Sequence, residues 1–182
     1  MKCDLKKDYS STAELPASLS TWVEASPLSD ADKTTYAKWL NSESTTVRDA
    51  LNAYFSSDDL KNTITPVWIQ SEPDRSIVTL LVSQSEVAPE PGEYGSILAY
   101  VRAYGYDASF LCSDCYGQLS CSSCAVEVLQ GQPENPTPKD EEYDMLDIDL
   151  EKPPTQFTRL SCQAVVGKEP LFCVIRAARP KN

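Results

Sequence analysis

Histidine is absent from this chain of 182 residues, and glycine is scarce, at six residues. Without histidine the chain can form no Ser-His or Cys-His catalytic pair, no His-ligated zinc site and no Rieske cluster, which needs two histidines on one iron. The shortage of glycine argues against a nucleotide cradle, and no phosphate-binding or metal-hydrolase motif occurs. We therefore expect a protein that is not an enzyme with its own substrate pocket.

Positive charge and long apolar runs are also in short supply. The chain has 16 Lys and Arg against 27 Asp and Glu, a formal net charge of −11. Such a surface repels nucleic acid and anionic lipid and favours basic protein partners. No apolar run reaches the roughly 18 residues of a transmembrane helix, so we expect no direct membrane span.

The seven cysteines stand out against this background. The N-terminal stretch "MKCDLKKDYSSTAELP" lacks the apolar core of a secretory signal, so nothing indicates an oxidising compartment. A disulfide framework is therefore not expected, and ligation of a metal or a cluster is the better interpretation of the cysteines.

The pattern of apolar residues predicts two regions. Residues 1–62 are expected to form a polar arm with two short amphipathic helices, over 29–40 and 45–55. Residues 63–182 mix strand and helix patterns, which predicts one small α+β domain. Its expected elements are strands at 65–70 and 76–83 joined as a hairpin, a helix within 94–107, a strand at 125–130, a helix over 137–150 and a strand at 171–177. In the second of these helices Thr137 is the expected cap and Pro138 the first helical residue.

The stretch "CSDCYGQLSCSSC" packs four of the seven cysteines into residues 112–124. One interpretation is a zinc site of two CxxC knuckles, formed by Cys112, Cys115, Cys121 and Cys124, although such knuckles usually lie about a dozen or more residues apart. A second is a set of reduced thiols in an apolar core, against which their crowding argues.

The third interpretation is an iron–sulfur cluster, which needs four thiolates, two on each of two irons. The loop would supply three ligands in a C-x5-C-x2-C pattern, and a distant segment would supply the fourth. The cysteines of this set are Cys115, Cys121, Cys124 and Cys162. Cys112 is then not a ligand, and it is expected, with Cys173, to be a small buried apolar residue.

At these residues the sequence resembles the adrenodoxin-type [2Fe–2S] ferredoxins. The resemblance is carried by "CYGQLSCSSC", "DEEYDMLD" and "TRLSCQ", and it extends over about residues 63–178. It implies a β-grasp fold with an N-terminal helical extension, one [2Fe–2S] cluster on the four cysteines of the third set, and one-electron transfer. Ser161 stands where this family usually has glycine before the fourth ligand.

The segment after Thr137 is also acidic, and Asp140, Asp144 and Asp147 fall on one face of the predicted helix. The ordinary interpretation is a solvated helix face. By resemblance, the same segment is the family's partner-recognition helix, which would dock a basic redox protein. The residues implied are Asp140, Glu141, Glu142, Asp144 and Asp147.

Residues 1–62 are extra relative to a plain shuttle ferredoxin, and they suggest an alternative function. The chain also resembles the ferredoxin-like bridge subunit of mitochondrial complex I in plants and protists, whose metal site can be structural or regulatory. A zinc-binding adaptor is the third hypothesis. The resemblance implies a place in the mitochondrial matrix, or on the matrix side of the inner membrane, in preference to a bacterial cytoplasm.

Overall fold

The structure is a computed structural model, and it describes residues 61–71, 77–150 and 153–176. Thr65–Asn182 form one compact unit, which contains every element described below except the first residue of the first strand. The two helices expected within residues 1–62 lie outside the described residues.

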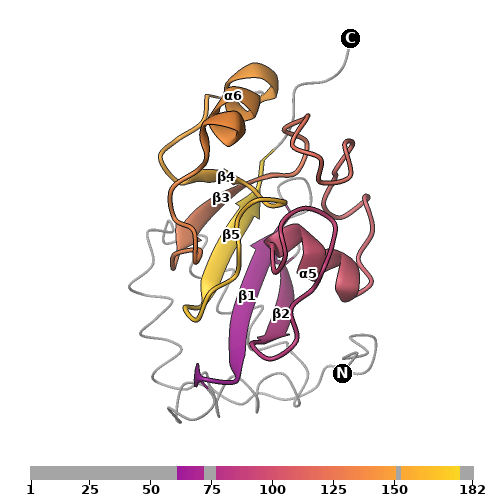
Figure 1. Cartoon of the computed structure of the whole chain (residues 1–182), viewed down its shortest axis with the longest axis vertical. Coiled ribbons are helices and arrows are strands. Elements are labelled where there is room, and N and C mark those ends of the chain that lie inside the picture. The colour runs from indigo at the N-terminus through magenta and orange to yellow at the C-terminus, as the bar shows by residue number, and fades with distance from the viewer. Residues whose placement is uncertain (1–60, 72–76, 151–152, 177–182) are drawn as a thin grey trace. The chain divides into compact units, whose positions relative to one another are not determined.

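A mixed sheet of five strands forms the centre of the domain (Figure 1). Its strands are β1 (Ile64–Gln70), β2 (Ile77–Ser83), β3 (Ala125–Gln130), β4 (Thr158–Leu160) and β5 (Leu171–Ile175), in the order β2-β1-β5-β3-β4. β1 and β5 are parallel, whereas β3 is antiparallel to both β5 and β4. This arrangement, with the first and last strands side by side at the centre, is the β-grasp fold expected from the sequence.

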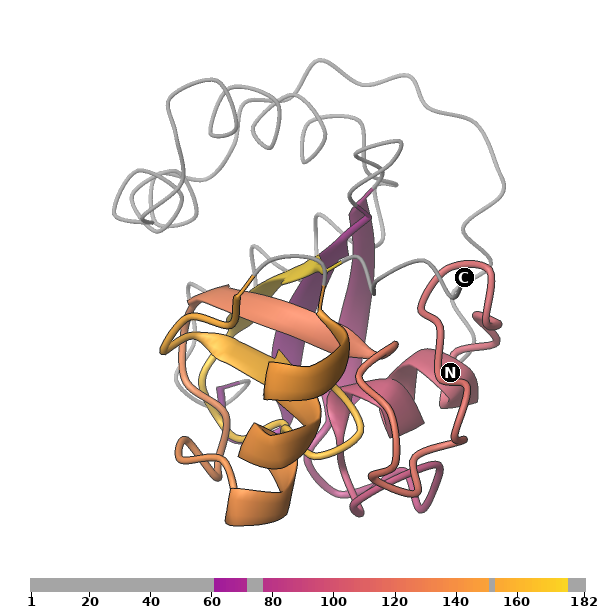
Figure 2. The same cartoon turned by 90° about the horizontal axis from the view of Figure 1, so that it is seen from above.

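Two helices cover one face of this sheet, as Figure 2 shows from above: α5 (Ile97–Ala103) and α6 (Asp140–Asp149). α5 contacts β2, and α6 contacts β4. The first five residues of α5, Ile97 to Val101, are buried in the core, whereas Arg102 is half-buried and Ala103 is exposed. The Ser96 side chain accepts a hydrogen bond from the Ala99 amide at its start, and Gly105 follows its end with a φ of 88°.

The apolar core lies between the helices and the sheet. In β1 the side chains of Val67, Trp68 and Ile69 are fully buried, so this strand is apolar on both faces. Leu98 and Val101 of α5 are buried to the same extent. The core thus fixes both ends of the segment 104–124, which carries three of the four expected ligands.

The expected strands agree with the structure within two residues at each end, and β1 and β2 are neighbours in the sheet. Two expectations were wrong. β4 was not predicted, because three residues are too few to show a periodic pattern. The second helix begins at Asp140, not at Pro138: Lys139 is extended and pairs with Glu93 through its ammonium, and no side chain caps the helix start.

Candidate metal centre

Arg102 of α5 fastens the beginning of the segment that leads to the cysteines. Its guanidinium donates hydrogen bonds to the carbonyl oxygens of Tyr106 (3.3 Å), Asp107 (3.0 Å) and Leu111 (2.6 Å), and to the Ser113 hydroxyl (3.0 Å). A planar guanidinium can satisfy several acceptors at once, so one side chain holds most of this irregular stretch. The sequence pattern gave no sign of this role for Arg102.

The loop that follows turns back on itself through left-handed backbone conformations. Tyr116, Gly117 and Leu119 have φ values of 52°, 80° and 55°. A Cβ atom on Gly117 would lie 2.4 Å from the Gly92 amide nitrogen, so only glycine allows the two loops to approach this closely. In this loop the backbone amides of Ser120 and Gln118 donate hydrogen bonds to the Cys115 thiol and favour its charged form.

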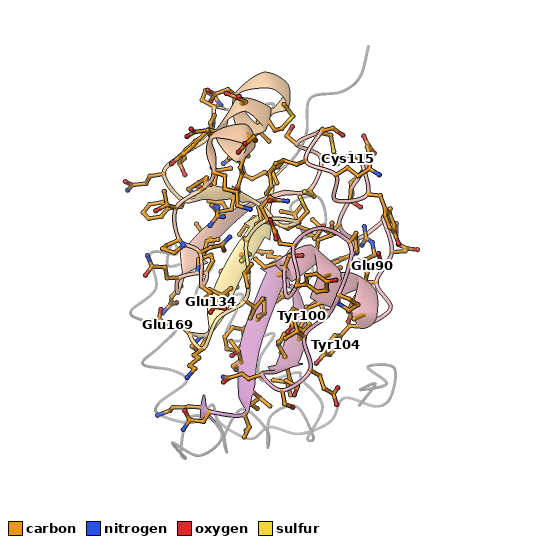
Figure 3. All side chains as sticks on the ribbon, viewed as in Figure 1. Glu90, Tyr100, Tyr104, Cys115, Glu134 and Glu169 are labelled. Atoms are coloured by element: carbon orange, nitrogen blue, oxygen red, sulfur yellow. The ribbon has the colours of Figure 1, made fainter. Side chains whose placement is uncertain are left out.

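Four thiols meet at this loop as two pairs. Cys115 and Cys121 lie within hydrogen-bonding reach of each other, and so do Cys124 and Cys162. The two pairs are themselves close enough for Cys115 and Cys162 to interact electrostatically. Figure 3 shows Cys115 on the loop at the edge of the domain. The structure therefore brings together all four cysteines of the third set.

The pKa values of the paired thiols move in opposite directions. A hydrogen bond from Cys162 lowers the pKa of Cys124 to about 7, and the same contact, with burial, raises the pKa of Cys162. In the other pair, burial raises the pKa of Cys121. At Cys115, burial by itself would raise the pKa, but hydrogen bonds from Ser120 and Cys121 outweigh it, and the pKa of Cys115 is lowered. One thiol in each pair thus has a pKa below that of a free cysteine and loses its proton more easily, and thiolates are the form that binds metal.

Backbone hydrogen bonds and close packing hold the segment around Cys162 against the cysteine loop and against Gly92. The Cys162 carbonyl oxygen accepts a hydrogen bond from the Glu93 amide (2.8 Å), and the Ser161 amide donates to the Cys124 carbonyl (3.0 Å). A Cβ atom on Gly92 would lie 2.3 Å from the Cys162 carbonyl oxygen. Gly92, in the loop that the sequence pattern left without a role, is thus required for the approach of the fourth cysteine.

The chemistry of this donor set fits a two-iron cluster better than a single ion. Within the ranges that the structure describes, no three Cys, Asp or Glu side chains converge closely enough to hold one metal ion. Two adjacent thiol pairs are what two irons need, with two thiolates on each. The zinc interpretation loses support because Cys112 is not paired with a thiol of this set, and Cys124 is paired with Cys162.

Buried hydroxyl groups around the thiols support the same fit. The Ser122 hydroxyl, between two of the cysteines, is fully buried and has no hydrogen-bond partner in the described part of the chain. A buried donor left without an acceptor costs about 1–3 kcal/mol, and the sulfur atoms of a cluster are acceptors. The Ser161 hydroxyl is likewise buried with no hydrogen-bond partner in the described part of the chain, and it lies near enough to Cys124 to lower the pKa of that thiol.

The remaining cysteines differ in their surroundings. Cys173, on β5, is fully buried, and burial raises its pKa to about 12, which confirms the expectation of a small apolar core residue. The same expectation was wrong for Cys112. Cys112 is only half-buried, and its thiol donates a hydrogen bond to a carboxylate oxygen of Asp114 at 3.1 Å.

The expected docking helix needs one correction. Asp140, Glu141, Asp144 and Asp147 are exposed on α6, as a docking face requires. Glu142 is buried: its carboxylate pairs with the Arg159 guanidinium and also accepts a hydrogen bond from the Leu160 amide. Glu142 therefore holds the helix to β4 and cannot contact a partner. None of the helices in the described ranges has the length and apolar character of a membrane span.

Residues 81–167 match the family model Fer2, described as a 2Fe-2S iron-sulfur cluster binding domain, and this range contains all four paired cysteines. The fold and this match together assign a [2Fe–2S] cluster to the domain, whose fold is the β-grasp fold of [2Fe–2S] ferredoxins. No curated protein matches the chain.

Several solved structures are similar to the chain. A single-substitution mutant of putidaredoxin, an Fe2S2 ferredoxin, is 20% identical, with a TM-score of 0.47 over 62% of this chain and 96% of that one. The ISC-like [2Fe-2S] ferredoxin FdxB from Pseudomonas putida is 24% identical, with a TM-score of 0.45 over 65% of this chain and 98% of that one. A ferredoxin from Rhodopseudomonas palustris HaA2 is 20% identical, with a TM-score of 0.44 over 60% and 94%.

Proposed function

We propose that this protein carries single electrons on a [2Fe–2S] cluster, with Cys115 and Cys121 on one iron and Cys124 and Cys162 on the other. The observation that carries the proposal is the meeting of two thiol pairs, one of which joins the loop to a turn 38 residues further along the chain. The cluster supplies a one-electron couple; the chain supplies the ligands, the donors around them and the exclusion of water.

Exposure of the ligands indicates where the electron passes. Cys124 and Cys162 are fully buried and Cys121 nearly so, whereas Cys115 is only half-buried. Tyr116, the next residue, is 61% exposed. We therefore place the electron exit at Cys115 and Tyr116, on the rim of the loop.

The partner is proposed to be a basic redox protein that docks over α6. Support comes from the four exposed carboxylates of α6 and from the net charge of −11, which together attract a cationic surface. Within the ferredoxins we propose the adrenodoxin-type subgroup, on the strength of the C-x5-C-x2-C spacing in the cluster loop.

The second candidate is an accessory subunit of a mitochondrial respiratory complex such as complex I, on the matrix side of the inner membrane. The observation that favours it is the length of chain before the domain. The four proposed ligands lie between residues 115 and 162, so residues 1–62 supply none of them. Those residues are proposed to join the domain to neighbouring subunits.

Visible absorption and low-temperature EPR of anaerobically purified protein, before and after dithionite, test the proposed function. We expect a brown protein with about two irons per chain, which bleaches on reduction and gains a half-integer-spin signal. A Cys162→Ser variant should lose the signal, whereas a Cys112→Ala variant should keep its iron. A colourless protein with one tightly bound zinc would refute electron transfer.

Native gel electrophoresis of the protein from its own source separates the two candidates. A free carrier migrates as a small protein, and an accessory subunit migrates with a respiratory complex. Removal of residues 1–62 should abolish co-migration and leave the cluster spectrum unchanged if the second candidate is right.

A further inference from the structure

The Ser123 hydroxyl occupies a defined place between two parts of the cluster loop. Its oxygen accepts a hydrogen bond from the Asp114 amide at 2.9 Å and lies 3.2 Å from the sulfur of Cys121, and the hydroxyl is also within hydrogen-bonding reach of the Cys112 thiol. Ser123 is 8% exposed, so water does not compete for these contacts. The hydroxyl has one proton, and the Asp114 amide already occupies one of the lone pairs of its oxygen.

The direction of the contact with Cys121 follows from this geometry. A thiolate that binds iron has no proton, so it can only accept. The Ser123 hydroxyl is therefore the donor, and the amide of Asp114 occupies a lone pair of its oxygen. Of the two sulfurs within its reach, the iron-bound thiolate of Cys121 carries negative charge and is a stronger acceptor than the protonated thiol of Cys112.

A third residue extends the arrangement. The Cys112 thiol donates to Asp114 Oδ1 at 3.1 Å, which restrains the residue whose amide holds Ser123. Cys112 thus contacts the side chain of Asp114, the backbone amide of Asp114 contacts Ser123, and Ser123 contacts the sulfur of Cys121. This arrangement accounts for the polar surroundings of Cys112, which the expected role of a buried apolar residue left unexplained.

We propose that Ser123 raises the reduction potential of the cluster by donating a hydrogen bond to Cys121, and that Cys112 and Asp114 are the positioning residues that hold it there. The proposal rests on the proposed function and deepens it. Reduction adds one negative charge to the cluster and its thiolates, and a donor to a ligand sulfur stabilises the more negative state more strongly. The hydrogen bond from Ser123 thus raises the potential, whereas the net negative charge of the protein lowers it by disfavouring reduction.

Redox titrations monitored by visible absorption test the proposal on the full chain with its cluster. In Ser123→Ala the equilibrium constant for one-electron reduction should fall roughly tenfold, a shift of about 59 mV to more negative potential. Ser123→Thr keeps the hydroxyl and should stay close to wild type. Ser85 is an exposed serine whose hydroxyl is hydrogen-bonded to Ser83, and Ser85→Ala, which should leave the potential unchanged, serves as the matched control.

The positioning role of Cys112 has its own pair of variants. Cys112→Ala removes the donor to Asp114 and should shift the potential in the same direction as Ser123→Ala, by a smaller amount. Cys112→Ser replaces the thiol by a hydroxyl that can donate to the same carboxylate, and it should restore the wild-type value. Equal potentials in these two variants would overturn the role of Cys112.

The outcomes distinguish this inference from the proposed function. A wild-type protein with no reversible one-electron couple overturns the function, and with it the inference. A reversible wild-type couple with an unchanged potential in Ser123→Ala overturns the inference alone. If Ser123→Ala binds no iron, resonance Raman spectra of wild type in H2O and D2O decide: Fe–S(Cys) bands that do not respond to exchange overturn the hydrogen bond.

Discussion

Glu142 and Arg159 form a buried, two-pronged ion pair between α6 and β4. The Arg159 Nε donates to one carboxylate oxygen at 2.9 Å and its Nη2 to the other at 3.0 Å, with the two side chains 3% and 1% exposed. The Leu160 amide adds a third donor at 2.7 Å. Because Leu160 lies two residues before Cys162, this pair connects the acidic helix to the segment that carries the fourth ligand.

Replacement of Glu142 by Gln should destabilise the domain strongly. The change leaves the Arg159 guanidinium buried without a counter-charge, which costs about 3–5 kcal/mol in other buried pairs. Urea unfolding monitored by circular dichroism measures the change in free energy of unfolding. Glu141→Gln, at the exposed neighbouring position, should change it by less than about 0.5 kcal/mol. Equal effects of the two substitutions would contradict the buried ion pair.

Gly92 and Gly105 offer a matched test of the close approach to Cys162. Both have nearly the same backbone, with φ values of 89° and 88°, but a Cβ atom on Gly92 meets the Cys162 carbonyl oxygen and one on Gly105 meets nothing within 4 Å. Gly105→Ala should cost about 1 kcal/mol of stability, because of its left-handed backbone, and keep the cluster. Gly92→Ala should lose the cluster as well, since Cys162 must move.

Iron content and the visible spectrum of the two purified variants measure this difference. A Gly92→Ala protein with full iron content and an unchanged spectrum would show that the fourth ligand does not depend on this contact.

These positions show how far the sequence alone could lead. The C-x5-C-x2-C spacing is a local signal, and the family resemblance that it helps to carry predicted the β-grasp fold before any contact was known. The ligand set predicted in the same way stays a prediction until the cluster is measured. Glu142 could not be separated from Glu141 in that way, because both are acids in the first turn of one helix, and only the contact with Arg159 distinguishes them. Gly92 and Arg102 likewise act across long sequence separations.

The exposed carboxylates of α6 should control the rate at which a basic partner reduces the protein. We expect Asp140→Asn, Asp144→Asn and Asp147→Asn together to slow reduction at low ionic strength by about tenfold or more, with the difference lost at high salt. The control changes three exposed glutamates, Glu86, Glu134 and Glu169, to Gln. It removes the same amount of charge at positions outside α6. Figure 3 shows Glu134 and Glu169 away from α6. Stopped-flow rates that fall equally in both variants would indicate net charge alone.

Cys173 should make the domain less stable at alkaline pH. Burial raises its pKa from 9.0 to about 12, so the folded state keeps the proton that the unfolded state releases. Its contribution is complete below pH 9 and is lost as the pH rises from 9 toward 12, at about 1.4 kcal/mol per pH unit. Cys173→Ala should remove this part of the slope. Urea unfolding of both proteins at several pH values in this window measures it, and parallel curves would contradict it.

Tyr116 combines exposure with an unfavourable backbone, one residue after a cluster ligand. Its φ of 52° is rare for a residue with a large side chain, whereas asparagine adopts such values readily. Tyr116→Asn should therefore stabilise the domain by about 0.5–1 kcal/mol and leave the potential close to wild type. The same variant should slow electron transfer to the partner several-fold, because it removes the aromatic surface beside Cys115.

Tyr116→Phe separates these two effects. It keeps the ring and the backbone strain, so both its unfolding free energy and its electron-transfer rate should remain near wild type. Urea unfolding and stopped-flow absorption of both variants measure stability and electron-transfer rate separately. Together they show whether the ring of Tyr116 speeds electron transfer to the partner at a position where its backbone conformation lowers stability. A stabilised Tyr116→Asn protein with an unchanged transfer rate would place the electron exit elsewhere on the rim.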